Sequence, residues 1–538
     1  MAKKRKEFVH LVAEESFENL MELRRGKSLQ EELEVTIYRE KQRVRVNPWK
    51  VDPEDDASYW EGMHQKLLQV DALPEEQKEE ELKKILRKIV QRYSEEIAGH
   101  FNPSQYHVTK TLVTIGFGRL LNAARVKGPW SVFSNQLDLD DKIHIKGKVD
   151  ELRRLAKIGT VVMVPTHYSN LDSVLIGWVI QFLGLPPFIY GAGLNLFNLK
   201  IFSYFMNSVG AYKVDRRKKN PLYLETLKAY STIAIREGCH SLFFPGGTRS
   251  RSGKIEKQLK LGLLGTAIEA QRQVFQSLDE EQKQNKVFIV PVAINYHFVL
   301  EAPSLINDYL KRKGQQKYYE ENDEYTTSYK ISKFLLKFFT RGSDISVTIG
   351  DGMDVLGNYV DTRGNSLDKH GQVIDIRDYF KSNGEVTENL QREQEYNRIL
   401  GKKIVEEFHR HNRIFSSQLV AYVAFRMLGR IHKHLDLYGL LRIQDDDLIL
   451  NYEDFKAKFQ EIVDVLKEKN ARGEVGLADH MFKADMDEVI SLGLKNLGMY
   501  HATIPVVKNK QGNIEVQSMN LLYYYHNKVL GYDLEKYF

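Results

Sequence analysis

One histidine and one aspartate stand where an apolar, strand-like segment gives way to an apolar, helix-like one: His167 and Asp172, in the string PTHYSNLD. Because α/β proteins place their sites at the carboxyl ends of strands, we expect His167 to face a site. An aspartate across a tight turn can accept a hydrogen bond from one imidazole nitrogen, which leaves the other free to take a proton from an alcohol. The same spacing recurs at positions 370 and 375 and at 480 and 485, where no buried strand precedes it. The preceding strand, more than the spacing, favours His167 as a general base.

A basic segment follows at residues 210–219, GAYKVDRRKK. An arginine such as Arg216 can bind two oxygens of a phosphate at fixed geometry, so the segment could capture an anion. A solvated basic turn would have the same composition. The segment alone leaves both interpretations open.

A third segment, residues 243–254, runs from an apolar strand into FFPGGTRSRSGK. Glycines allow the backbone to approach a ligand closely, and arginines with neighbouring hydroxyls suit a phosphate. The spacing of its glycines and the residue after Lys254 differ from those of a P-loop. The candidate phosphate-binding residues of this segment are Gly247, Thr248, Arg249, Ser250 and Arg251.

The elements that must position these residues form an α/β pattern from about residue 136 to 390. Apolar, β-branched segments alternate there with helical ones, which predicts a mixed or largely parallel sheet with flanking helices. The expected strands are 160–164, 188–192, 241–244, 287–293 and 345–349. Pro291 lies inside one of them and indicates a sheet edge or a bulge. Residues 1–135 and 391–538 are predicted to be mainly helical, as in 75–97, 396–410 and 419–437, with a strand at 502–507.

The amino-acid composition excludes some classes of function. The 538 residues are 42% hydrophobic and 28% charged, with a net charge of +6. No dense basic and aromatic stripe indicates a nucleic-acid partner. The single cysteine, Cys239, is expected to be buried and unreactive, and its isolation indicates a reducing compartment. The longest apolar stretch, 171–190, is interrupted by polar residues and prolines, so no membrane-spanning helix is expected. The N-terminus, MAKKRKEF, is basic but has no apolar stretch behind it, so no secretory signal is expected.

Taken in order, these segments resemble the glycerol-phosphate and lysophosphatidate acyltransferase superfamily, whose members carry a His-x4-Asp motif. His167 and Asp172 match that motif, residues 210–216 match its second block, 244–250 its third and 290–292 its fourth. Asn195-Leu196, residues 220–223, the string RSRSGK and the segment 416–425 are similar to the glycerol-3-phosphate branch. The resemblance covers about residues 90 to 430.

The resemblance implies that His167 is the general base and Asp172 orients it. It further implies that Arg216, Arg249 and Arg251 hold the acceptor phosphate, assisted by Ser250 and the loop amides. The donor would be acyl-CoA or acyl-carrier protein, with no metal or prosthetic group, and the protein would lie on the cytoplasmic face of a membrane. Two alternatives stay open: a 1-acyl-glycerol-3-phosphate acceptor, or dihydroxyacetone phosphate in its place. A third is a non-catalytic lipid- or phosphate-binding protein on a decayed acyltransferase fold.

One position departs from the family pattern. The third block usually reads Phe-Pro-Glu-Gly-Thr-Arg-Ser, and here the glutamate is replaced by Gly246. We expect water or a nearby glutamate to take the place of the missing carboxylate.

Two further segments could contact lipid. Residues 330–341, KISKFLLKFFTR, have the pattern of an interfacial helix, and a helix packed on its own core would have the same pattern. The aromatic stretch 194–206 could line an acyl channel, although core packing is the simpler interpretation.

Overall fold

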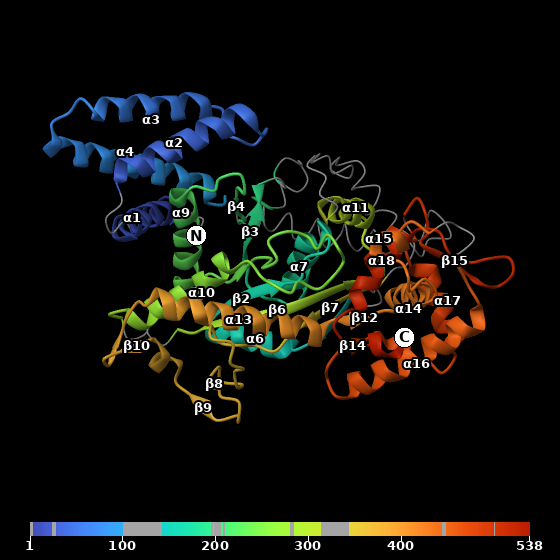
Figure 1. Cartoon of the computed structure of the whole chain (residues 1–538). Coiled ribbons are helices and arrows are strands. Elements are labelled where there is room, and N and C mark those ends of the chain that lie inside the picture. Colours follow the sequence, from blue (N-terminus) through green and yellow to red (C-terminus); the bar gives the residue numbers. More distant parts are fainter. Residues whose placement is uncertain are drawn as a thin grey trace, which may run out of the picture.

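The computed structural model describes residues 4–23, 28–100, 143–194, 197, 206–207, 210–279, 285–313, 344–443, 448–499 and 501–538. Figure 1 shows a helical N-terminal part at one end, a central sheet covered by helices, and a helical C-terminal part at the other end. The expected helices or aromatic segments at 330–341 and at most of 194–206 lie outside the described residues. Of the latter, Leu194, Phe197 and Met206 are described, and all three are buried in the core.

The central sheet has seven strands in the order β1-β7-β6-β2-β5-β3-β4, and every pairing is parallel except that between β6 and β7. The predicted mixed, largely parallel α/β sheet is therefore confirmed. The strands are β1 (Ile143–Gly147), β2 (Thr160–Pro165), β3 (Ile189–Gly193), β4 (Tyr212–Val214), β5 (Ser241–Leu242), β6 (Val287–Tyr296) and β7 (Ile345–Ile349).

Strand β2 shows why the middle of the sheet is apolar throughout. Successive side chains of a strand point to opposite faces. Val162 and Val164 belong to one apolar cluster, with α10 and α13, while Val161 and Met163 belong to another, with α7 and α14. Helices therefore cover both faces of β2, and every residue of the strand is buried. The helices next to the sheet are α6 (Val149–Ile158), α7 (Leu171–Phe182), α9 (Pro221–Arg236), α10 (Leu261–Gln276), α11 (Ala302–Lys313) and α13 (Leu390–His411).

Pro291 lies in β6, which is an interior strand of the sheet. The prediction that Pro291 marks a sheet edge is therefore wrong, whereas the alternative prediction of a bulge holds. The strand pairs Val292 with Ile349 and, through an isolated bridge, Ile289 with Met353. Between these pairs two residues of β6 face three of the partner segment. The missing N–H of proline is accommodated at this irregularity.

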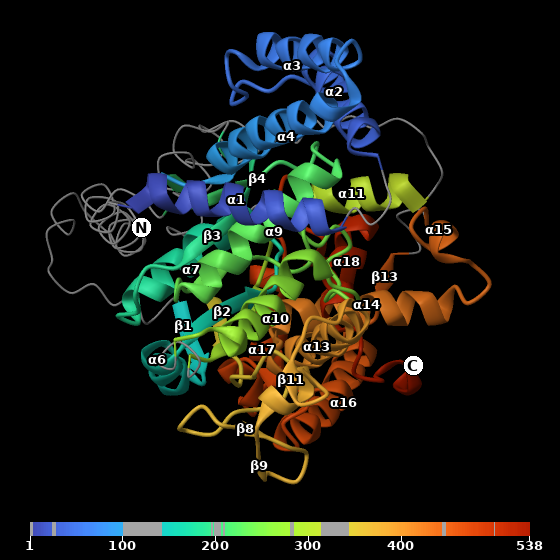
Figure 2. The same ribbon diagram turned by 90° about the vertical axis from the view of Figure 1, so that its left-hand side faces the viewer.

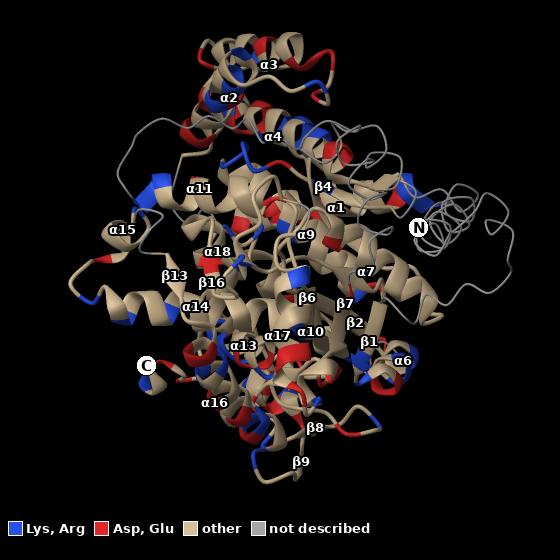
Figure 3. Cartoon of the chain, turned by 90° about the vertical axis from the view of Figure 1, so that its right-hand side faces the viewer, with Lys and Arg blue, Asp and Glu red and all other residues tan. Residues whose placement is uncertain are grey.

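The N-terminal helices pack together and contact the central part of the molecule at α9 and at the edge strand β4. They are α1 (Arg5–Leu23), α2 (Leu29–Val46), α3 (Asp56–Val70) and α4 (Glu75–Ile97). Helices α1 and α4 pack on each other and on α9, whereas α2 and α3 lie farther out (Figure 2). The helix expected at 75–97 is α4. Basic and acidic side chains are interspersed along these outer helices (Figure 3).

The C-terminal part shares an apolar core with the sheet, since one cluster of buried side chains runs from Ile143 of β1 to Leu534. Helix α18 packs on α14 and α11. The helices here are α14 (Ser416–Ile431), α15 (Leu437–Leu440), α16 (Tyr452–Ala471), α17 (Met486–Asn496) and α18 (Met519–His526), followed by the 3-10 turn η10 (Asn527–Val529).

The remaining elements are short strands and 3-10 turns. They are β8 (Ser366–Leu367), β9 (Val373–Ile374), η7 (Ile376–Phe380), β10 (Lys381–Ser382), β11 (Glu385–Val386), β12 (Arg413–Ile414), β13 (Ile449–Leu450), β14 (Gly476–Leu477), η9 (Asp479–Phe482), β15 (Val506–Lys508), β16 (Ile514–Val516) and η11 (Glu535–Tyr537). The strand expected at 502–507 begins later, as β15. The boundaries proposed at 135/136 and 390/391 stay predictions.

Candidate active site

His167 lies in the turn between β2 and α7, at the carboxyl end of a central strand. Its Nδ1 is 2.9 Å from Asp172 Oδ2. The other ring nitrogen, Nε2, has no partner in the described part of the chain, and the side chain is 13% exposed. The arrangement holds the imidazole in one orientation and leaves Nε2 available to a ligand.

Asp172 is fully buried and is fixed by four hydrogen bonds. Besides His167, its Oδ2 accepts from the backbone amides of Tyr168 (2.6 Å) and Ser169 (2.9 Å). Its Oδ1 accepts from the hydroxyl of Tyr296, at the end of β6, at 2.5 Å. These four donors hold the carboxylate in one orientation. Asp172 thus supplies a rigid acceptor for the His167 ring.

The loop that follows β5 packs against His167 from the other side. The ring of Phe244 stacks on the imidazole, with centroids 4.1 Å apart. The Ser250 amide donates to the His167 carbonyl at 2.8 Å, and the Ser250 hydroxyl donates to the Lys254 carbonyl. Gly247 has a φ of +74°, which favours glycine. Thr248 is partly exposed.

Glu301 links this loop to the histidine turn, and the sequence analysis missed it. Its carboxylate accepts from the Asn170 amide at 2.9 Å and from the Ser169 hydroxyl at 3.0 Å. It also accepts from Arg249 Nη1 at 3.2 Å. Glu301 follows β6 much as His167 follows β2, and this position after a neighbouring strand is the signal that could have revealed it.

The three predicted arginines come close enough to influence one another. Arg251 Nε pairs with Asp308 at 2.6 Å, and Arg249 pairs with Glu301. Arg216 is exposed and makes no ion pair within the described residues. Desolvation lowers the pKa of Arg216, and the charges of Arg249 and Arg251 lower it further. An anion bound here would relieve that repulsion.

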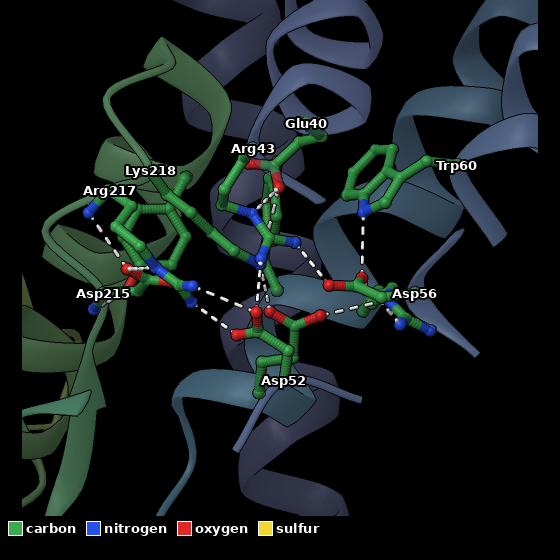
Figure 4. A network of polar contacts seen from close by, with 12 residues as sticks. Glu40, Arg43, Asp52, Asp56, Trp60, Asp215, Arg217 and Lys218 are labelled. Atoms are coloured by element: carbon green, nitrogen blue, oxygen red, sulfur yellow. Dashed lines mark hydrogen bonds and ion pairs between the residues drawn. The ribbon is translucent and has the colours of Figure 1, made fainter. Parts of the chain in front are cut away.

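The basic segment 210–219 is divided between two roles. Arg217 donates to Asp215 and to Asp52, with Nη1 3.0 Å from Asp52 Oδ2 (Figure 4). Lys218 pairs with Glu96 of α4. Both cations are buried and neutralised by the N-terminal helices, so the solvated-turn interpretation is wrong for them. Arg216, by contrast, is exposed and keeps the character expected of an anion ligand.

The network in Figure 4 extends into the N-terminal helices. Arg43 pairs with Glu40 at 2.7 Å and also with Asp56, which accepts from the Trp60 indole at 3.0 Å. Buried charges are stable only when paired and hydrogen-bonded, as they are here. The N-terminal part is thereby fastened to the loop that carries Arg216.

The two other His-x4-Asp spacings form no comparable site. Asp375 and Asp485 instead accept from backbone amides, as caps of η7 and α17. His480 bonds to the Ser416 hydroxyl at 2.9 Å, and burial lowers its pKa to about 4.

Among the described residues, one group could in principle ligate a metal: Asp351, Glu407 and His411. Lys148 lies 3.1 Å from Asp351, and Arg410 3.6 Å. These cations and the bond between His411 and Glu407 already balance the carboxylates, which makes the group an ion-pair network.

Comparison with known proteins bears directly on this geometry. Residues 146–295 match the family model described as Acyltransferase. The matched segment contains the histidine turn, the Arg216 loop and the loop after β5, so the predicted superfamily resemblance is confirmed for it.

Relatives of this chain carry related names. A glycerol-3-phosphate acyltransferase of Aeromonas hydrophila is 32% identical over 170 residues, which are 31% of this chain and 20% of the relative. One of Alteromonas mediterranea is 30% identical over 178 residues, 33% of this chain and 20% of the relative. A dihydroxyacetone phosphate acyltransferase of Oryctolagus cuniculus is 29% identical over 157 residues, 28% and 22% of the two chains. The matches thus span about a fifth of each relative's length.

None of the helices in the described ranges combines the length and the hydropathy needed to cross a bilayer.

Proposed function

We propose that the protein transfers a fatty acyl group from a thioester to a hydroxyl of glycerol-3-phosphate. The observation that supports this best is the pairing of His167 with the buried Asp172 in a segment that matches the acyltransferase family model. The same segment carries Arg216, Arg249 and Arg251, which influence one another electrostatically. Acyl transfer to an alcohol requires a base, and the acceptor phosphate requires cations. The site offers both within one group of loops.

The transfer would proceed by direct attack. His167 Nε2 takes the proton of the acceptor hydroxyl as its oxygen bonds to the thioester carbonyl carbon. The C–S bond then breaks, and the departing thiolate receives the proton from the imidazolium. Asp172 holds the ring and stabilises its positive charge, as an orienting carboxylate does in other histidine-dependent acyl transfers.

The acceptor phosphate would bind first to Arg216, which has no carboxylate to leave. Arg249 and Arg251 would contribute while keeping Glu301 and Asp308 as partners. Ser250, Gly247 and Thr248 border the same loop and would complete the binding surface. Their role in binding is part of the proposal.

The donor would be acyl-CoA or acyl-carrier protein, and the lipid product implies work at a membrane surface on its cytoplasmic side. No metal or prosthetic group enters this chemistry. A second candidate acceptor is dihydroxyacetone phosphate, which the name of the Oryctolagus cuniculus relative favours.

The test is a paired acceptor assay with purified protein and lipid vesicles. Labelled palmitoyl-CoA, or palmitoyl-carrier protein, is offered with glycerol-3-phosphate, dihydroxyacetone phosphate or 1-acyl-glycerol-3-phosphate. We expect product with glycerol-3-phosphate. Product with one of the other acceptors alone would change the substrate and keep the mechanism. No product from folded protein with any donor and acceptor would refute the proposal and favour a non-catalytic binding protein.

A further inference from the structure

The position at which the family glutamate is missing is filled by another glutamate. A Cβ built on Gly246 would lie 2.6 Å from Oε1 of Glu256 and 3.0 Å from its Cδ. Real Cβ atoms essentially never approach another atom so closely. The Glu256 carboxyl group therefore takes the space that a side chain at position 246 would enter. Glycine at 246 and glutamate at 256 depend on each other.

The surroundings of this carboxyl group are unusual. Both oxygens of Glu256 are buried, and among the described residues no side chain donates a hydrogen bond to them. Burial raises the pKa of Glu256 to about 7, and the negative charge of Asp172 adds to the shift. The backbone amide of Glu256 and the charge of Lys528 oppose it. The group is thus electrostatically coupled to the orienting aspartate of the site.

Lys528 reaches this place from the C-terminal part of the chain. It lies in η10 and is 1% exposed, and its Nζ has no hydrogen-bond partner in the described structure. The Nζ lies over the ring of Tyr168, 2.6 Å from the centroid, one residue from His167. Burial lowers the pKa of Lys528 well below its usual value, and Asp172 and Glu256 counteract that effect.

Two contacts fix η10 in this position. The Asn527 side chain donates to the Ser252 carbonyl at 2.8 Å, within the loop after β5. The carbonyl of Tyr524 lies where a Cβ on Gly253 would be. The C-terminal segment is thus docked on the arginine loop. A lysine buried without direct partners is costly, so its burial against the histidine turn needs a reason.

We propose that Glu256 and Lys528 are positioning residues of the His167 site: Glu256 supplies, from the far side of the loop, the carboxyl group that position 246 lacks, and Lys528 is its counter-charge. The inference rests on the proposed acyl-transfer function. Glu256 and Lys528 interact through their opposite charges without a direct hydrogen bond, and Lys528 packs over Tyr168 of the histidine turn. The C-terminal region is by this inference a part of the active site.

Moving the carboxylate from position 256 to position 246 tests the proposed role of Glu256. Gly246→Glu alone is expected to lower kcat at least about 100-fold, because its side chain would collide with Glu256. Glu256→Gly alone removes the carboxylate and is expected to lower kcat at least about tenfold. The double variant Gly246→Glu/Glu256→Gly should recover at least about tenfold over Gly246→Glu. Gly262→Glu is the matched control, since a Cβ there meets no atom within 4 Å.

A double variant no more active than Gly246→Glu would overturn this role of Glu256. The melting temperatures of the same four proteins give a readout that needs no activity. If the two positions share one carboxylate site, the double variant should melt at a higher temperature than Gly246→Glu. A double variant whose loss in melting temperature is the sum of the two single losses would contradict this. If the wild-type protein transfers no acyl group to any acceptor, the proposed function fails. The comparison of melting temperatures still decides whether positions 246 and 256 share one carboxylate site.

Substitution of Lys528 tests the proposed role of its charge. Lys528→Met keeps the length and removes the charge, and is expected to lower kcat about 10- to 100-fold with the acceptor KM changed less than about threefold. Removing both charges, in Glu256→Gln/Lys528→Met, should raise the melting temperature above that of Lys528→Met, because neutralising a whole buried pair is better tolerated than breaking it. If Lys528→Met does not fold, the neutral double variant carries the kcat measurement. A wild-type kcat in either variant would overturn the role of the C-terminal region.

Discussion

Two neighbouring arginines should respond in opposite ways to the same substitution. Arg217 is 8% exposed and donates to Asp52 and Asp215. The Arg217→Ala variant would leave Asp215 buried without its cation and Asp52 with only Arg43 as an ionic partner. Breaking a buried pair typically costs about 3–5 kcal/mol of folding free energy. Arg216 makes no ion pair with any described residue, so Arg216→Ala should leave the free energy of unfolding within about 0.5 kcal/mol of wild type.

The effect on acyl transfer should be the reverse. Loss of one charged hydrogen bond to the acceptor phosphate is worth about 1.5–3 kcal/mol. For Arg216→Ala this is about a 10- to 150-fold fall in kcat/KM for glycerol-3-phosphate. Folded Arg217→Ala should keep kcat/KM within about fivefold, because the side chain faces the N-terminal helices and away from the acceptor.

Urea unfolding and initial rates on the same preparations measure both quantities, with exposed Lys219→Ala as the matched control. An Arg216→Ala protein that is destabilised and fully active, or an Arg217→Ala protein that is fully stable, would refute the division of the basic segment into a phosphate ligand and a structural pair.

Three further outcomes are expected. Asp172→Asn should lower kcat about 10²- to 10⁴-fold, because the histidine loses its charged acceptor, whereas Asp375→Asn, at the same spacing from a histidine, should be neutral in the rate assay. Glu269→Gln should stabilise the protein at about pH 8 by about 1–3 kcal/mol and have little effect at about pH 4. Burial and the charge of Glu225 raise the pKa of Glu269 to about 7. The contribution of the Glu269 side chain to folding stability is therefore full below its unfolded pKa and is lost as the pH rises through 7. Urea unfolding at the two pH values checks this. Burial raises the pKa of Cys239 to about 11, so its reaction with a disulfide reagent at about pH 8 should be about 100-fold slower than that of a free thiol, and rapid labelling of folded protein would contradict this.

Sequence patterns predicted the buried half of the fold well. The five expected strands are all present because interior strands are continuously apolar, as β2 and β6 are. Strands β1 and β4 were missed because they lie at the two edges of the sheet, where half of the side chains are polar or exposed. The helix at 419–437 was placed too far along, since α14 ends at Ile431.

The site was predictable only where its residues are neighbours in sequence. His167 and Asp172 lie on either side of one turn after an apolar strand, so the strand and the spacing together carried the signal. Glu301 also follows an apolar strand, but no second residue near it in sequence drew attention to it. Lys528 is a single charged residue far along the chain, and nothing local distinguishes it from a surface residue. The carboxylates that neutralise the basic segment likewise come from distant helices, as Asp52 does. Tertiary contacts assign such residues, and their types alone do not.

The most direct test of the account is the rate of acyl transfer by the His167→Ala variant. Removal of the base should lower kcat about 10²- to 10⁴-fold. Binding of glycerol-3-phosphate, measured by calorimetry, should change less than about threefold, because the arginines remain. A variant that transfers acyl groups at the wild-type rate would contradict the assignment of His167 as the base, and with it the central claim.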